Sequence, residues 1–176
     1  SELRTIPNVG KATERDLIAM GYTTVASLKG KTADELYAEE CALRGFTLDR
    51  CQLYLLRAVA YFVNAEAPAP EKCAWHLWTD DTALPSPCGA VCAECAQYPA
   101  LCSGCRKTAG KAPWLKYIGA ERCPVYACCV DGKGLKDCGA CPSLPCGKFT
   151  KDPTISDEQN AENLRKMTEN LKARKK

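Results

Sequence analysis

Apolar residues recur at helical spacing through the first 73 residues of the chain and become scarce after them. Because an amphipathic helix repeats its apolar side chains every three or four positions, this pattern predicts helices over about 12–20, 25–28, 33–40 and 48–63. The core positions are Leu17, Ile18, Leu28, Leu36, Leu53, Leu55, Leu56, Val59 and Phe62. The second half has few aliphatic residues to bury, so we expect disulfides or metal ions to hold its fold.

A last helix is predicted over about 157–174, beginning after the capping residue Ser156. Its apolar stripe is narrow and consists of Ala161, Leu164, Met167 and Leu171. The basic residues of the tail are Lys172, Arg174, Lys175 and Lys176. So few apolar positions favour a solvated helix with a frayed basic end over a helix that is packed along its length.

Two short hairpins are predicted between the first helices, at residues 6–13 and 29–31. In such turns glycine, or an asparagine that tolerates left-handed backbone, leaves amide N–H groups at the start of the next helix free to bind phosphate. The candidate nucleic-acid contacts are Asn8, Gly10, Lys11, Lys29, Gly30 and Lys31. Residues 1–73 hold nine Lys/Arg and ten Asp/Glu, a net charge of −1 that favours a scaffold over a phosphate-binding surface.

The motif Asp49-Arg50-Cys51, the pair Leu53-Tyr54 and the two tryptophans of residues 75–78 occur together in the first 80 residues. With the hairpin at 6–13, they resemble the bacterial pathogenicity-locus family of helix-hairpin-helix proteins. They are also similar to the C-terminal domain of TfoX-type competence regulators. The resemblance implies a mainly α, SAM-like five-helix domain and brings no established activity.

Some residues near this domain invite a chemical role but have a simpler interpretation. His76, Cys41, Cys51 and Cys73 are expected to be packed residues, because no second ligand of suitable spacing lies beside them. The proline-containing segments 65–70 and 82–87 are expected to be an extended spacer and strap. The tryptophan segment between them is expected to fold back on the helices.

Eleven of the fourteen cysteines lie between Cys88 and Cys146. Three pairs have two residues between them, the spacing that lets both sulfurs reach one tetrahedral metal ion. The predicted metal ligands are Cys88, Cys92, Cys95, Cys102, Cys105, Cys123, Cys128, Cys138, Cys141 and Cys146. The adjacent thiols Cys128 and Cys129 leave open which of the two is a ligand.

The cysteine-rich half also carries a family pattern, with Tyr98 and Arg106 at fixed places among its cysteines. Residues 88–148 resemble DUF3795, a family of uncharacterised cysteine-rich proteins of bacteria and archaea. The resemblance implies a small, irregular, metal-stabilised domain followed by the C-terminal helix.

Zinc is the preferred metal, as two ions, because the run of cysteines typical of ferredoxins is missing; an iron–sulfur cluster is the alternative. One predicted site consists of Cys92, Cys95, Cys102 and Cys105, and the other of Cys123, Cys128, Cys138 and Cys141. An interleaved arrangement that uses Cys88 and Cys146 remains open. No His lies in this half, and its carboxylates form no motif, so no catalytic residue is predicted.

The predicted organisation is a helix-hairpin-helix domain over 1–80, a connector over 81–87, a zinc-binding domain over 88–150, and a helix with a basic tail over 151–176. We expect a non-enzymatic adaptor that binds a DNA or RNA backbone or a protein, and no membrane. The alternative is a redox protein with an iron–sulfur cluster or an exchangeable dithiol. No signal-like segment or membrane span is seen, and reduced thiols suit the cytoplasm, where we expect the protein.

Overall fold

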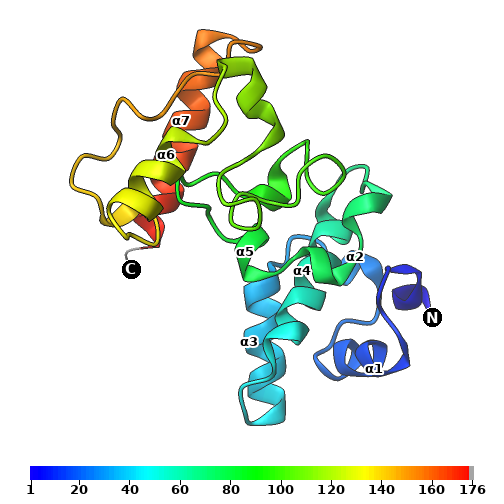
Figure 1. Ribbon diagram of the computed structural model, residues 1–176. Helices are drawn as coiled ribbons and strands as arrows, with labels where there is room; N and C mark the ends of the chain where they lie inside the picture. The colour runs from blue at the N-terminus through cyan, green and yellow to red at the C-terminus, as the bar shows by residue number, and fades with distance from the viewer. Residues whose placement is uncertain (175–176) are drawn as a thin grey trace. The chain divides into compact units, whose positions relative to one another are not determined.

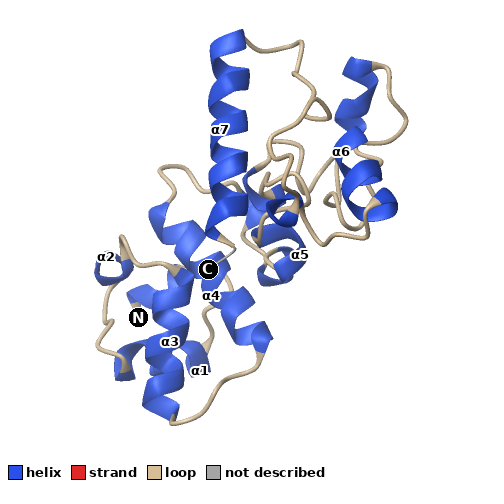
Figure 2. Cartoon of the chain, turned by 90° about the vertical axis from the view of Figure 1, so that its left-hand side faces the viewer, coloured by secondary structure: helices blue, strands red, loops and turns tan. Residues whose placement is uncertain are grey.

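The computed structural model describes residues 1–174, and every regular element among them is a helix (Figures 1 and 2). The chain divides into two compact units, Ser1–Asp80 and Asp81–Lys176. The α-helices and the π-helix are α1 (Lys11–Ala19), α2 (Val25–Leu28), α3 (Ala33–Arg44), α4 (Arg50–Asn64), α5 (Asp80–Ala83), α6 (Pro124–Tyr126), a π-helix (Ala127–Gly132) and α7 (Asp157–Ala173). Short 3-10 helices cover Glu2–Thr5, Pro70–Lys72, Trp75–Leu77, Cys92–Glu94, Pro113–Ile118 and Cys138–Ala140.

Local capping sets where the helices of the first unit begin and end. Thr32 starts α3 with a reciprocal capping box to Glu35, as the sequence predicts. The helix then continues to Arg44, beyond the predicted end near residue 40, and stops at Gly45 in left-handed conformation. Asp49 accepts a hydrogen bond from the Cys51 N–H and so starts α4 at Arg50, two residues later than the sequence predicts.

The core of the first unit lies where α3 and α4 pack side by side, with α1, α2 and the first 3-10 helix against them (Figure 1). Its buried residues are Leu3, Ile6, Val9, Leu17, Tyr22, Leu28, Leu36, Leu56, Val59 and Val63. Ile18, predicted as a core residue, is 47% exposed, because Leu17 takes the inward-facing position on α1. The aliphatic core is thus the main source of stability of this unit.

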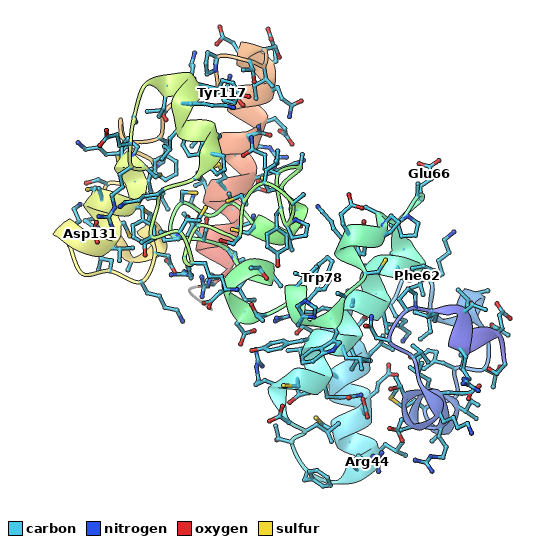
Figure 3. The ribbon with its side chains drawn as sticks, turned by 45° about the vertical axis from the view of Figure 1, so that its right-hand side comes forward. Arg44, Phe62, Glu66, Trp78, Tyr117 and Asp131 are labelled. Atoms are coloured by element: carbon cyan, nitrogen blue, oxygen red, sulfur yellow. The ribbon has the colours of Figure 1, made fainter. Side chains whose placement is uncertain are left out.

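The segment after α4 folds back onto it, which confirms the prediction for the tryptophan segment. Trp78, labelled in Figure 3, packs against Tyr61 with 5.1 Å between ring centroids. Arg57 donates to the Trp78 carbonyl and forms an ion pair of 2.9 Å with Asp80. Arg50 binds the same carboxylate through two hydrogen bonds. Asp80 therefore links the end of the unit to α4.

Three packing expectations are wrong. His76 is exposed and contacts only the edge of Trp75 among the aromatic rings, because its 3-10 helix turns both rings outward. Cys51 is exposed rather than buried, since it follows the α4 cap on the outer face. Residues 82–87 are packed rather than extended: Thr82 and Ser86 are buried, and the Ser86 N–H donates to the Ala90 carbonyl.

The second unit consists mostly of loops around a small core of Val125, Cys129, Cys138 and Leu171. Helix α7 contributes Leu171, which is fully buried, so the expectation of a solvated helix is wrong for its C-terminal half. There the backbone of α7 passes so close to Gly89 that a Cβ on this residue would overlap the Met167 carbonyl.

The end of α7 is held rather than frayed. Arg174 donates to the Pro85 carbonyl at 2.7 Å and lies 3.4 Å from the Asp137 carboxylate. The last two tail residues, Lys175 and Lys176, lie outside the described residues. None of the helices in residues 1–174 has the length and hydropathy needed to span a bilayer.

Candidate metal centre and hairpins

The eleven cysteines of the second unit line two cavities. The larger cavity has a volume of about 540 Å³. Its cysteines are Cys88, Cys92, Cys95, Cys102, Cys105 and Cys123. The four ligands predicted for the first zinc site all belong to this set, and they lie on the 3-10 helix Cys92–Glu94 and the turns that follow it.

The smaller cavity, of about 20 Å³, is close to the space that one water molecule or metal ion requires. Its cysteines are Cys128, Cys129, Cys138, Cys141 and Cys146. The π-helix supplies the first two, and the 3-10 helix Cys138–Ala140 and the loop after it supply the others. Cys123 lines the larger cavity instead, although it was assigned to the second site.

Two pairs of thiols are in direct contact. Cys105 donates hydrogen bonds from its side chain and its backbone N–H to Cys92, which lowers the pKa of Cys92 to about 6 despite its burial. The same bond raises the pKa of Cys105. Burial, together with a hydrogen bond to Cys129, raises the pKa of Cys138 to about 12. Each cavity therefore contains a close pair of sulfurs, one of which is readily deprotonated in the larger cavity.

Lys133 provides positive charge at the smaller cavity, where its ammonium lies 3.2 Å from the Cys141 sulfur. Hydrogen bonds from the Ser143 backbone and from Lys133 lower the pKa of Cys141, and the same contact raises the pKa of Lys133. A thiolate is the form of cysteine that binds a metal. The environment of Cys141 therefore favours its ligand form.

The sulfurs meet in pairs and not in groups of four. Within residues 1–174, no three His, Cys, Asp or Glu side chains lie close enough together to hold one metal ion as they are placed. The set of donors is nonetheless all sulfur, which fits zinc or an iron–sulfur cluster and does not fit magnesium or calcium. None of the fourteen cysteines forms a disulfide.

The first predicted hairpin, residues 6–13, has a left-handed residue at the expected position. Asn8 adopts a left-handed φ of 68°, and its side-chain amide donates to the Cys73 carbonyl at 2.6 Å. Gly10 precedes α1 without any side-chain cap, and Lys11 at the helix start is exposed. Side chains therefore leave the first amides of α1 available to an anion.

The second hairpin, residues 29–31, is closed by side chains of its own unit. The Gly30 N–H donates to Asn64 at 2.6 Å, and the Asn64 amide donates to the Lys31 carbonyl. Lys31 forms an ion pair with Glu39. Of the predicted contacts, only Asn8, Gly10 and Lys11 thus lie at a hairpin whose next helix has no side-chain cap.

Sequence reasoning missed two contributors to these sites, Asn64 and Lys133. Lys133 stands five residues beyond Cys128, and a lysine so near a metal-type cysteine is a signal that could have been used. Asn64 gave no signal, since it lies 34 residues from Gly30 and meets it only through the packing of α4.

A family model described as Cdd1, pathogenicity locus, matches residues 1–83. No curated protein and no solved structure matches the chain. The match ends before the cysteine-rich half, whose resemblance to DUF3795 stays a prediction. Residues 1–83 are therefore similar to the pathogenicity-locus family, as the motifs of α4 and the tryptophan segment predict.

Proposed function

We propose that the second unit is a structural zinc module and that the whole chain is a non-enzymatic adaptor. The observation that carries this proposal is that all eleven cysteines of residues 88–146 line two cavities of one small unit. Zinc bound by four thiolates is closed to substrate and contributes directly to folding. This role suits a unit with so small an apolar core.

We assign one zinc ion to each cavity. In the larger cavity the ligands are Cys92, Cys95, Cys102 and Cys105, with Cys88 and Cys123 as neighbours. In the smaller cavity they are Cys128, Cys138, Cys141 and Cys146, so that Cys146 replaces Cys123 in the second set. Lys133 offsets part of the negative charge of the four thiolates, and Cys129 beside them donates a hydrogen bond to the Leu135 carbonyl.

Metal analysis of protein purified without added metal tests this assignment. We expect about two zinc ions per chain, and the loss of about one of them in Cys92→Ser and in Cys141→Ser. Cys51→Ser removes an exposed thiol of the first unit and is the matched control, which should retain both ions. Protein without metal, in which all thiols react freely, would overturn the proposal.

The redox alternative has a clear signature in the same preparation. An iron–sulfur cluster would give a brown protein that absorbs at about 400 nm and contains iron and sulfide. The contact between Cys92 and Cys105 is also compatible with an exchangeable dithiol. A colourless protein with stoichiometric zinc removes the cluster.

We further propose that the adaptor contacts a nucleic-acid backbone through the first hairpin alone. Gly10 and Lys11 present amides and a positive charge, whereas the second hairpin is closed by Asn64. In a gel-shift titration with duplex and single-stranded DNA at low salt, Lys11→Ala should weaken binding several-fold. Lys31→Ala is the matched control and should leave binding unchanged. Absence of binding at low salt would leave a protein partner as the target of the adaptor.

A further inference from the structure

The second unit has a third cavity beside the larger one. Its volume of about 10 Å³ is close to the space that one water molecule or ion requires. Cys88, Cys105 and Cys123 line this small cavity, and all three also line the larger one. With a single zinc ion bound by the ligands assigned above, Cys88 and Cys123 would line an ion-sized space without binding an ion.

Two sulfurs of the larger cavity already form a contact pair. The Cys105 backbone N–H donates to the Cys92 sulfur at 3.3 Å, and the two thiols are hydrogen-bonded to each other. Arg106 places positive charge near Cys92. Hydrogen bonds and charges of this kind hold a metal ligand in position and offset the negative charge that thiolates bring together. This pair is thus the part of the cavity that is already arranged for metal binding.

Cys88 lies among the other thiols of the larger cavity. It interacts electrostatically with Cys92, Cys105 and Cys123. Like Cys123, it is partly buried and packs against the small core of the unit. Thiolates gathered so closely repel one another, and a cation placed between them relieves the repulsion. The positions of Cys88 and Cys123 therefore favour a metal ion in the small cavity.

The six cysteines of the larger cavity suffice for two zinc ions if the ions share two thiolates. A tetrahedral zinc ion needs four ligands, so two separate ions would need more sulfurs than the cavity has. Two thiolates that each bind both ions make up the difference, as in modules with two zinc ions and six cysteines. Sulfurs that are shared in this way must lie in contact, as those of Cys92 and Cys105 do.

We propose that the larger cavity and the small cavity beside it hold a binuclear zinc centre. The first ion keeps the four ligands already assigned to it. The second ion is bound by Cys88 and Cys123 and shares the thiolates of Cys92 and Cys105 with the first. This inference rests on the proposed zinc module and adds one ion to it. As placed in residues 1–174, no third donor lies close enough to the pair to hold an ion, so metal binding draws the outer sulfurs in and stabilises the unit.

The second ion of the centre binds more weakly than the first, because two dications that share ligands repel each other. The chain purified without added metal should therefore contain about two zinc ions, one from each metal site, and take up a third when zinc is supplied.

Zinc content after addition of zinc and desalting tests the proposal on the full chain. We expect about three ions in the wild-type chain and about two in Cys88→Ser and in Cys123→Ser. The exposed Cys51→Ser is the matched control and should reach the wild-type content. A wild-type chain that stays at about two ions would overturn the binuclear centre and leave the zinc module standing. A chain that binds no zinc would overturn both.

NMR of the chain loaded with cadmium-113 in place of zinc tests whether the two ions share thiolates. We expect one resonance per ion, and the two resonances of the binuclear centre should be split by coupling through the bridging sulfurs. Cys123→Ser should remove one of these two resonances and the splitting of the other. Circular dichroism is measured on both serine variants, and the wild-type spectrum decides if neither folds. Resonances without any coupling would indicate separate sites and overturn the proposal.

Discussion

Glu40 is a carboxylate on α3 with only 2% of its surface exposed, and Gln52 is its hydrogen-bond partner. Burial raises the pKa of Glu40, although the bond from Gln52 acts in the opposite direction. The folded state therefore holds this proton more tightly than the unfolded chain does. The contribution of Glu40 to stability is greatest below the unfolded pKa of about 4.5 and is lost as pH rises through the folded value.

Glu40→Gln should consequently stabilise the first unit at pH 8, by roughly 1 kcal/mol, and change little at pH 4. The neutral amide keeps a partner for Gln52 and removes the buried charge. Hydrogen exchange of α3 and α4 amides in urea measures the effect. Glu39→Gln is the neighbouring control: the bond from Tyr22 and the charge of Lys31 lower the pKa of Glu39, so its loss should destabilise the unit at pH 8. A destabilising Glu40→Gln at pH 8 would contradict this account.

Asp80 interacts with two arginines and with the Tyr54 hydroxyl. Burial acts to raise the pKa of Asp80, but the guanidinium groups of Arg50 and Arg57 outweigh it and hold the pKa below its usual value. The Arg57 side chain is only 9% exposed, so the loss of its carboxylate would leave a nearly buried cation unpaired.

Asp80→Asn should therefore destabilise the first unit by roughly 2 kcal/mol, less than for a fully buried pair because Asp80 is partly exposed. Thermal unfolding, followed by the fluorescence of Trp75 and Trp78, provides the measurement. Lys151→Gln breaks an ion pair whose side chains are 72% and 80% exposed, and it should have little effect. A similar decrease in unfolding temperature in both variants would mean that the Asp80 ion pairs stabilise the unit no more than an exposed surface pair does.

At the level of elements, the approach of α7 to the loops of the second unit depends on Gly89. This residue has a φ of 92°, and a Cβ there would overlap the Met167 carbonyl and lie 2.9 Å from Leu171 Cγ. The left-handed φ opposes a side chain through backbone strain, and the two close contacts oppose it through crowding.

Gly89→Ala should separate α7 from its loops and cost more than about 3 kcal/mol. Gly119→Ala is the matched control, since Gly119 has a φ of 64° but no atom within 4 Å of its added Cβ. It should cost only the strain of left-handed backbone, about 1 kcal/mol. Protection of α7 amides in hydrogen exchange reports the difference. Equal losses in the two variants would show that crowding against α7 is unimportant.

The elements that sequence predicts well are those with local causes. The capping box of Thr32 and Glu35 and the left-handed Asn8 follow from neighbouring residues, and both are confirmed. The closure of Gly30 by Asn64 depends on a partner from a distant helix, which no local pattern reports. The narrow apolar stripe of α7 predicts a solvated helix. The helix packs nonetheless, because Gly89 and Gly139 have no side chains and its backbone can approach them closely.

The same distinction applies to the candidate metal centre. Cysteine spacing identified the residues that line the cavities, because two intervening residues form one turn. Spacing groups Cys123 with Cys128, whereas in the structure the π-helix after Tyr126 directs Cys128 and Cys129 to the smaller cavity and Cys123 lines the larger one. Metal identity and number stay predictions.

For the whole molecule, the two units differ in what holds them together. The first has an aliphatic core across four α-helices, and the second has the small core around Leu171 together with its cysteines. If zinc supplies the missing stability, chelation should unfold one unit and spare the other.

Treatment with EDTA and a thiol-specific mercurial should therefore abolish amide protection in α7 (Asp157–Ala173) and leave that in α4 (Arg50–Asn64) intact. Added zinc after removal of the mercurial should restore the protection. Hydrogen exchange with mass spectrometry resolves the two regions in one experiment. Simultaneous loss in both helices, or loss in neither, would contradict independent stabilisation.

The hydrogen bond from Asn8 to the Cys73 carbonyl joins the first turn of the chain to the end of the same unit. Asp80 then fastens that end to α4, a few residues before the family match stops at residue 83. A shortened version that stops after α4 would lose the brace on its own first hairpin. We therefore expect that moving this unit into another protein requires the whole of residues 1–83, including the tryptophan segment.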